Sequence, residues 1–158
     1  MIQVAKFEKV SLTEYAKSAP AESYENIRLP RRATKGSAGY DFFASFAFTA
    51  APGETVKIPT GVRVKIDEGW VLGIYPRSSL GFKYRLTLNN TVGIIDSDYY
   101  GAENEGHIFI KMTNCGDIPL KVEEGGAFAQ GIFTPYGITY DDDAATLRTG
   151  GLGSTDKK

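Results

Sequence analysis

Apolar and polar residues alternate along most of this 158-residue chain, in short runs that turn-forming residues separate. Val62, Val64 and Ile66 show the alternation clearly. Side chains two positions apart lie on the same face of a strand, so such a run predicts a strand with one buried face. The denser apolar run at residues 70–75 predicts a strand that is buried on both faces. Turn signals recur about every eight to twelve residues, which favours an all-β sandwich or barrel.

The same pattern predicts further strands and one short helix. Ser11-Leu12-Thr13-Glu14 fits a capping box, in which the Ser11 oxygen accepts a first-turn N–H and Glu14 reaches back to another. The box predicts a brief helix that Pro20 ends. Strands are predicted at residues 2–10, 37–48, 55–58, 62–66, 107–112, 118–122 and 127–133.

A turn, an apolar strand and acidic residues follow one another in residues 89–101. Asn89 and Asn90 favour a turn, because asparagine tolerates left-handed conformations and its short amide can bond the local backbone. The apolar run at residues 92–95 then meets Asp96 directly. This order predicts a hairpin whose second strand opens into a cleft, with backbone N–H and C=O groups exposed at the tip.

Length and composition limit the kind of protein. A chain of 158 residues is long enough for one domain with a sizeable core. No run of 18 apolar residues occurs, so no membrane-spanning segment is expected. The net charge of −1 leaves no basic surplus for a polyphosphate backbone, which disfavours nucleic-acid binding. The first residues lack a signal-peptide pattern and Cys115 is a single cysteine, so a reducing cytoplasm is expected.

The character of the chain changes near its end. Residues 141–143 are three aspartates, and residues 150–153 include three glycines. Glycines at this density cannot pack a core and leave a segment mobile. We therefore expect a β domain over residues 1–140 and a flexible, glycine-rich C-terminal arm over residues 141–158.

Five short motifs give the chain a resemblance to one enzyme family. TVGIIDSDYYG at residues 91–101 resembles the central motif of the trimeric dUTP pyrophosphatases, or dUTPases. The family's other four motifs have counterparts in the same order, namely AGYDFFA at 38–44, PRSSLG at 76–81, AFAQGIF at 127–133 and RTGGLGST at 148–155. Each match is weak alone, but together they cover most of the domain.

The resemblance implies a fold, an assembly and a reaction. The fold is a jelly-roll-like β-barrel or sandwich, assembled as a homotrimer whose active sites are shared between subunits. The reaction converts dUTP and water to dUMP and pyrophosphate with Mg²⁺. It limits uracil incorporation into DNA and supplies dUMP for dTMP synthesis. The C-terminal arm is implied to close over the active site.

The resemblance also implies roles for individual residues. Asp96 would orient the attacking water as a general base, and Tyr99 would pack under the deoxyribose. Asp41 would hold Mg²⁺ through water. The triphosphate needs positive charge and hydrogen-bond donors. The implied substrate-binding residues besides Tyr99 are Arg77, Ser78, Ser79, Asn90, Gly93, Gln130, Arg148, Leu152, Gly153 and Ser154.

The chain departs from the family pattern in four places. Ala127 stands where many members carry a basic residue, and Leu152 replaces the usual Phe. The spacing from Arg148 to the following glycine pair is one residue shorter than the commonest form. The loop at residues 101–106 is a few residues longer than in the family, so the uracil contact that follows it has no named counterpart here.

Two alternative functions stay open on the sequence alone. dCTP deaminase shares the fold, but it has a catalytic Glu in the strand after the hairpin, where this chain has Lys111. That difference argues against deamination. The other alternative is a dUTPase-like protein that regulates a binding partner. Asp41, Asp96 and Arg148 are all present, which argues for catalysis and leaves an added partner open.

Overall fold

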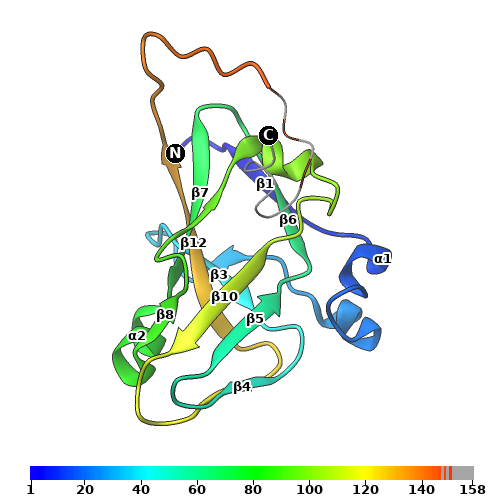
Figure 1. Cartoon of the computed structure of the whole chain (residues 1–158), viewed down its shortest axis with the longest axis vertical. Coiled ribbons are helices and arrows are strands. Elements are labelled where there is room, and N and C mark those ends of the chain that lie inside the picture. Colours follow the sequence, from blue (N-terminus) through cyan, green and yellow to red (C-terminus); the bar gives the residue numbers. More distant parts are fainter. Residues whose placement is uncertain (147, 149, 151–158) are drawn as a thin grey trace.

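The computed structural model describes residues 1–146, 148 and 150, and it consists mainly of strands (Figure 1). The strands are β1 (Ala5–Lys9), β2 (Arg31–Arg32), β3 (Tyr40–Phe43), β4 (Phe48–Ala50), β5 (Thr55–Pro59), β6 (Val62–Ile66), β7 (Trp70–Pro76), β8 (Leu86–Leu88), β9 (Gly93–Ile95), β10 (Phe109–Asn114), β11 (Leu120–Val122) and β12 (Ala127–Pro135). The helical segments are α1 (Leu12–Tyr15), η1 (Ala21–Asn26), α2 (Ser78–Tyr84) and η2 (Ser97–Gly101). The predicted all-β class is confirmed, and α2 adds a second short α-helix to the predicted one.

The strands form one five-stranded sheet and three smaller sheets. The large sheet has the order β2-β3-β12-β7-β9, and the next has the order β5-β10-β8. Figure 1 shows the long strand β12 running through the middle of the molecule, with β10 and β5 crossing its path in this view. Side chains from both sheets fill one core. Its fully buried members include Phe42, Leu72, Ile110, Met112 and Phe128.

The position of β12 brings three of the sequence motifs together. β12 pairs antiparallel with β3 on one side and with β7 on the other. In this register Gln130 lies between Asp41 of β3 and Tyr75 of β7. The following residue, Gly131, has no room for a side chain, because a Cβ there would lie 2.8 Å from Leu72 Cδ1. The AGYD, PRSS and AFAQG segments are therefore neighbours in the large sheet.

The strand predicted at residues 37–48 is two strands in different sheets. β3 ends at Phe43 and pairs with β12, whereas β4 begins at Phe48 and pairs with β11. Phe42 and Ala44 are buried, as the alternation predicts, but the chain then turns toward the other sheet. Strands of β-sandwiches switch sheets at such corners. Alternation continues through a corner, so the pattern alone does not reveal it.

The predicted hairpin at residues 89–95 is a turn between two sheets. In the described part of the chain β8 pairs with β10 and β9 pairs with β7, so β8 and β9 are not partners of each other. The turn itself forms, with the Thr91 N–H donating to the Leu88 carbonyl at 3.1 Å. Thr91 has the left-handed conformation, at φ +64°, that we expected of the asparagines. The hairpin prediction was wrong because long-range partners, rather than the turn, select the pairing of each strand.

The chain leaves the sheets after β12. Residues 136–146 form neither helix nor strand, and three large apolar residues there, Tyr136, Ile138 and Tyr140, are exposed. Figure 1 shows this segment, in orange, running outside the sheets. The division between a domain at 1–140 and an arm at 141–158 stays a prediction, since residues 151–158 lie outside the described residues. Within residues 1–146, 148 and 150, no helix is long and apolar enough to cross a membrane.

Candidate active site

Asp41, Arg77 and Gln130 form one cluster because β12 lies between β3 and β7. Arg77 follows the last residue of β7, and its Nε lies 3.0 Å from Asp41 Oδ1. The Gln130 Nε2 donates to the Pro76 carbonyl at 3.0 Å. Gly39 leaves space for this amide, since a Cβ at Gly39 would lie 2.5 Å from Gln130 Oε1. The structure thus brings together an acid, a guanidinium and an amide from three sequence motifs.

A polar cavity of about 170 Å³ opens at this cluster, and we call it the Arg77 pocket. Ser78 contributes to its lining, and the next residue of α2, Ser79, is exposed. Ser37 also lines the pocket, although the sequence analysis did not single it out; its place directly before the AGYD motif was the available signal. Guanidinium, hydroxyl and amide donors suit phosphate oxygens. The full lining is Ala33, Ser37, Gly39, Asp41, Arg77, Ser78 and Gln130.

The Arg77 pocket fits Mg²⁺ when a polyphosphate shares the ion. Among the described residues, no group of three His, Cys, Asp or Glu side chains could hold a metal ion. Asp41 is the acid of the pocket lining, and its side chain is only 17% exposed. Mg²⁺ typically keeps several waters and binds one or two carboxylates together with substrate phosphates. One carboxylate beside several phosphate donors therefore suits a Mg²⁺–triphosphate rather than a protein-only metal site.

Asp96, Asp98, Tyr99 and Arg148 form a second group, which we call the Asp96 cluster. Asp96 directly follows β9 and precedes η2, and its side chain is 50% exposed. Arg148 Nη2 lies 2.8 Å from Asp96 Oδ2, and Arg148 Nε lies 2.9 Å from Asp98 Oδ1. The guanidinium carbon is 5.8 Å from the centre of the Tyr99 ring. Arg148 therefore contacts the predicted base rather than the phosphate donors.

The Tyr99 side chain is buried and its hydroxyl has two partners. The hydroxyl donates to the His107 carbonyl at 2.8 Å, and it accepts from Asn104 Nδ2 at 2.8 Å. Burial raises the pKa of the Tyr99 hydroxyl, which keeps the group protonated as a donor. A ring held in this way presents a fixed surface three residues after the predicted base.

The predicted uracil contacts lie on the turn that precedes β9 and at the first residue of β9. Asn90 is exposed on this turn, and the Val92 N–H donates to its carbonyl at 2.6 Å. Gly93 is buried and pairs with Ile74 of β7. A Cβ at Gly93 would lie 3.0 Å from Ile74 Cβ, so a side chain there would crowd the neighbouring strand. The turn therefore combines an exposed backbone tip with a glycine that lets β9 approach β7.

The Arg77 pocket and the Asp96 cluster lie at opposite ends of β7. β9 runs antiparallel to β7, with Ile95 opposite Leu72. Asp96 is therefore level with Val71, six positions before Arg77. At about 3.3 Å per residue, the two sites are separated by about 20 Å along the strand. One chain therefore does not bring Asp96 together with the phosphate donors of the Arg77 pocket.

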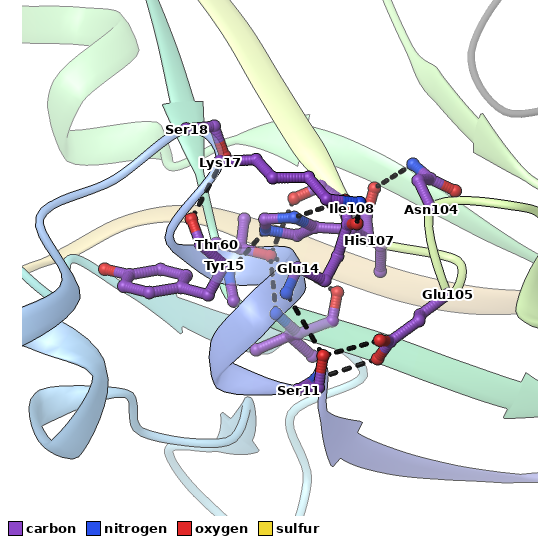
Figure 2. Close-up of polar contacts among 12 residues, drawn as sticks. Ser11, Glu14, Tyr15, Lys17, Ser18, Thr60, Asn104, Glu105, His107 and Ile108 are labelled. Carbon is purple, nitrogen blue, oxygen red and sulfur yellow. Dashed lines mark hydrogen bonds and ion pairs between the residues drawn. The ribbon is translucent and has the colours of Figure 1, made fainter.

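Figure 2 shows a polar network that joins α1 to the loop after η2 and that the sequence analysis did not foresee. Ser11 Oγ accepts the Glu14 N–H at 3.1 Å, as the capping box predicts. Glu14 does not reach back, however, because Glu105 accepts both the Ser11 N–H, at 2.8 Å, and the Ser11 hydroxyl, at 2.5 Å. The Glu14 carboxylate instead pairs with Lys17 and lies 3.8 Å from His107 Nδ1. The second half of the capping-box prediction was therefore wrong, since an acid distant in sequence takes that position.

His107, the single histidine, is fully buried just before β10 (Figure 2). Its Nε2 accepts the Gly61 N–H at 2.9 Å, so this nitrogen carries no proton. Burial lowers the pKa of His107 to about 4, although the Glu14 carboxylate acts in the opposite direction. A neutral imidazole therefore supports the start of β10 near pH 7.

Comparison with known proteins gives a consistent set of relatives. A family model described as dUTPase matches residues 25–155. A deoxyuridine 5'-triphosphate nucleotidohydrolase of Lactococcus lactis subsp. lactis is 44% identical over 137 residues, which cover 84% of this chain and 91% of the relative. The crystal structure of dUTPase from Streptococcus mutans is 37% identical, with a TM-score of 0.68 over 84% of this chain and 97% of that chain. The dUTPase of Staphylococcus bacteriophage 80alpha with dUpNHpp is 21% identical and shares the fold, with a TM-score of 0.69 over 94% of this chain and 92% of that chain.

Proposed function

We propose that this chain, which belongs to the dUTPase family and is a dUTP diphosphatase, builds each active site from different copies of itself. The Arg77 pocket of one subunit binds the triphosphate, and the Asp96 cluster of a neighbouring subunit supplies the general base. The observation that carries this proposal is the separation of about 20 Å between Asp96 and Arg77 along β7. A homotrimer with cyclic symmetry closes such a heterologous contact, so that every pocket meets one cluster.

Asp96 orients the attacking water. The residue stands at the end of β9 with a half-exposed carboxylate, so water can reach it. The products are dUMP and pyrophosphate, so the bond between the α- and β-phosphates breaks and one water is consumed. The carboxylate accepts a proton from that water as the new P–O bond forms. The pyrophosphate leaves with the electron pair of the broken bond.

The Arg77 pocket stabilises the negative charge of the triphosphate. Arg77, Ser78, Ser79 and Gln130 donate hydrogen bonds to phosphate oxygens, and preorganised donors of this kind stabilise charge that develops in the transition state. Asp41 would hold Mg²⁺ through water, and the ion when bound supplies positive charge to the phosphates. The contact between Arg77 and Asp41, at 3.0 Å, keeps the guanidinium directed toward the pocket before the nucleotide arrives.

The turn before β9 and the Tyr99 ring select the nucleoside. Asn90 and Gly93 present backbone groups that read uracil, in a space too narrow for the methyl group of thymine. The Tyr99 ring packs under the deoxyribose, where a 2′-hydroxyl would collide with it. Both elements lie beside Asp96 in sequence, so the subunit that supplies the base also selects the substrate.

Arg148 and the residues after it close the site. Arg148 exchanges its contact with Asp96 and Asp98 for the triphosphate when the substrate binds. Leu152, Gly153 and Ser154 cover the nucleotide as part of the same arm; they lie outside the described residues. Hydrolysis then limits uracil incorporation into DNA and supplies dUMP for dTMP synthesis.

Mixing two inactive variants tests the shared site. Asp96→Asn and Arg77→Gln are each expected to lose most turnover, the first by losing the base and the second by losing a phosphate donor. Refolded together in equal amounts, they form trimers in which about one site in four combines an intact cluster with an intact pocket. We therefore expect recovery of about a quarter of wild-type turnover, with sedimentation showing a trimer.

The matched control mixes Arg77→Gln with Gln130→Ala. Each of these variants carries its substitution in the Arg77 pocket, and the whole pocket belongs to a single chain. No combination of the two kinds of subunit therefore restores a complete pocket, and no recovery is expected. If the Asp96→Asn and Arg77→Gln mixture stays as inactive as this control, or if the wild-type protein sediments as a monomer, the shared-site proposal is wrong.

A further inference from the structure

The loop between η2 and β10 contacts Tyr99 directly. Asn104 Nδ2 donates to the Tyr99 hydroxyl at 2.8 Å and to the His107 carbonyl at 3.3 Å. The Tyr99 hydroxyl donates to the same carbonyl at 2.8 Å. The three groups form a closed triangle of hydrogen bonds. Figure 2 shows one side of it, the bond from the Asn104 amide to the His107 carbonyl. The triangle fixes the hydroxyl end of the ring in addition to the packing around it.

The loop has a backbone shape that needs support. Glu105 and Gly106 both have left-handed conformations, with φ of +57° and +70°. A Cβ at Gly106 would lie 2.7 Å from the Tyr99 carbonyl oxygen, so the loop is pressed against the backbone of η2. A residue other than glycine pays a steric penalty in the left-handed region. Glu105 adopts this unfavourable conformation, and its side chain reaches Ser11, the N-cap residue of α1.

The contact with α1 supplies the support. Glu105 accepts two hydrogen bonds from Ser11, one from the backbone N–H at 2.8 Å and one from the hydroxyl at 2.5 Å. These bonds hold the pKa of the Glu105 carboxyl below its usual range, so it stays ionised and bound near pH 7. His107, which follows the loop, is anchored by the Gly61 N–H. Glu105 and His107 are thus both anchored, and Gly106 between them lies against the backbone of Tyr99.

We infer that Asn104 is a positioning residue that sets the preference for deoxyribose over ribose by holding the Tyr99 ring, with Glu105 bracing the loop against α1. The inference rests on the proposed function, in which the Tyr99 ring excludes a 2′-hydroxyl. Exclusion of one hydroxyl requires that the ring not move aside, and the hydroxyl triangle resists that movement.

The experiment compares kcat/KM for dUTP and UTP in Asn104→Leu, which keeps the side-chain size and removes the donor. One hydrogen bond corresponds to about a three- to tenfold effect. We expect the ratio of kcat/KM for dUTP to that for UTP to fall by about this factor, mainly through a lower KM for UTP. The kcat for dUTP should change less than the ratio does.

The matched control is Tyr100→Phe. It removes the hydrogen bond from the neighbouring tyrosine hydroxyl to Glu8, 2.7 Å long, without touching Tyr99. General destabilisation would affect both variants, but only Asn104→Leu should change the ratio. A double-mutant cycle provides a second readout. In a Tyr99→Phe background the effect of Asn104→Leu on the ratio should disappear, because the partner hydroxyl is gone.

Two further variants separate the possible failures. If Tyr99→Ala abolishes the preference for dUTP while Asn104→Leu leaves it unchanged, the role of Asn104 is wrong and the role of Tyr99 stands. If Tyr99→Ala itself leaves the preference unchanged, the proposed role of Tyr99 is wrong and the inference fails with it. Should Asn104→Leu not fold, Glu105→Gln replaces it. That variant weakens the bonds to Ser11 and is expected to lower the ratio by a smaller factor, so an unchanged ratio overturns the inference.

Discussion

Arg148 Nη2 lies 2.8 Å from Asp96 Oδ2, so the predicted phosphate ligand and the predicted base are bound to each other. A second contact, from Arg148 Nε to Asp98 Oδ1 at 2.9 Å, completes the arrangement. An arginine in this position occupies a carboxylate oxygen that a water would need. In the proposed mechanism, substrate binding must therefore draw Arg148 away before Asp96 can act as the base.

Replacing Asp96 with Asn should lower turnover by about a hundredfold or more, the range expected for a lost general base. The amide keeps the size of the side chain but cannot accept the proton of the water. Nucleotide should still bind, because the phosphate donors lie at the other end of β7. Steady-state turnover and calorimetric binding of dUpNHpp measure the two effects. Near-normal turnover in this variant would show that another group is the base.

Truncation of the chain before Arg148 should collapse turnover while leaving the assembly intact. Arg148 and the glycine-rich residues after it contribute donors to the triphosphate in the proposed site, but they lie beyond the strands that build the core. Turnover and sedimentation of the truncated protein test this prediction. Unchanged turnover would mean that the fifth motif is a plain tail and that its resemblance to the family is accidental.

Replacing Leu152 with Phe should lower KM for dUTP several-fold. Base–aromatic stacking contributes about 1–3 kcal/mol, and leucine can supply only part of it through apolar contact. The ordering of a glycine-rich arm costs about 1–2 kcal/mol per fixed residue, so added stacking should favour closure. The appropriate measurement is KM for dUTP in the full-length variant, with Leu152→Ala as the opposite control. An unchanged KM in both would indicate that the shortened spacing after Arg148 places residue 152 away from the base.

Replacing Tyr99 with Ala should admit ribonucleotides. The ring is 5% exposed and beside Asp96, so its removal leaves space where a 2′-hydroxyl could fit. Tight pockets discriminate single groups by about 1–3 kcal/mol, and we expect the preference for dUTP over UTP to decrease by a comparable amount. The two kcat/KM values, measured for wild type and variant, give this preference. If it is retained in full, deoxyribose selection lies elsewhere.

The stability of the protein should decrease as the pH falls from about 6.5 toward 4, and His107 should account for part of the decrease. The folded-state pKa of about 4 lies below the unfolded value near 6.5, so the unfolded chain takes up the proton first. The contribution of His107 to the free energy of unfolding is thus fully present above pH 6.5, and up to about 3 kcal/mol of it is lost by pH 4. The charged groups facing the imidazole are Glu14, Glu105 and Lys57.

Urea unfolding at pH 7 and pH 4.5, at one protein concentration, measures this dependence. His107→Gln is the control, since glutamine cannot titrate and can still accept the Gly61 N–H with its side-chain oxygen. The variant is expected to be less stable than the wild type at pH 7, but its pH dependence should be shallower. Equal slopes in the two proteins would assign the whole dependence to carboxylates.

Local patterns in the sequence were sufficient for most of the strands and for the family. The alternation at residues 62–66 became β6, and the dense run at residues 70–75 became β7, which is buried at residues 72–74 and pairs with β12 and β9 along its two edges. The AGYD, PRSS, IID and AFAQG segments were recognisable because residue type and spacing within a motif are local properties. The all-β class and the dUTPase family followed from these two kinds of pattern.

Long-range pairing was decided only in the folded chain. The pattern of residues 37–48 did not show where the chain changes sheets, and the turn at Asn90 did not show that β8 and β9 have different partners. Glu14 had the right spacing to complete the cap of α1, yet Glu105, 94 residues from Ser11, took that place. The physical reason is the same in each case. A strand or a carboxylate satisfies its hydrogen bonds with whichever partner the packed core brings near, and sequence separation does not reveal that partner. The same rule placed Asp96 and Arg77 at opposite ends of β7.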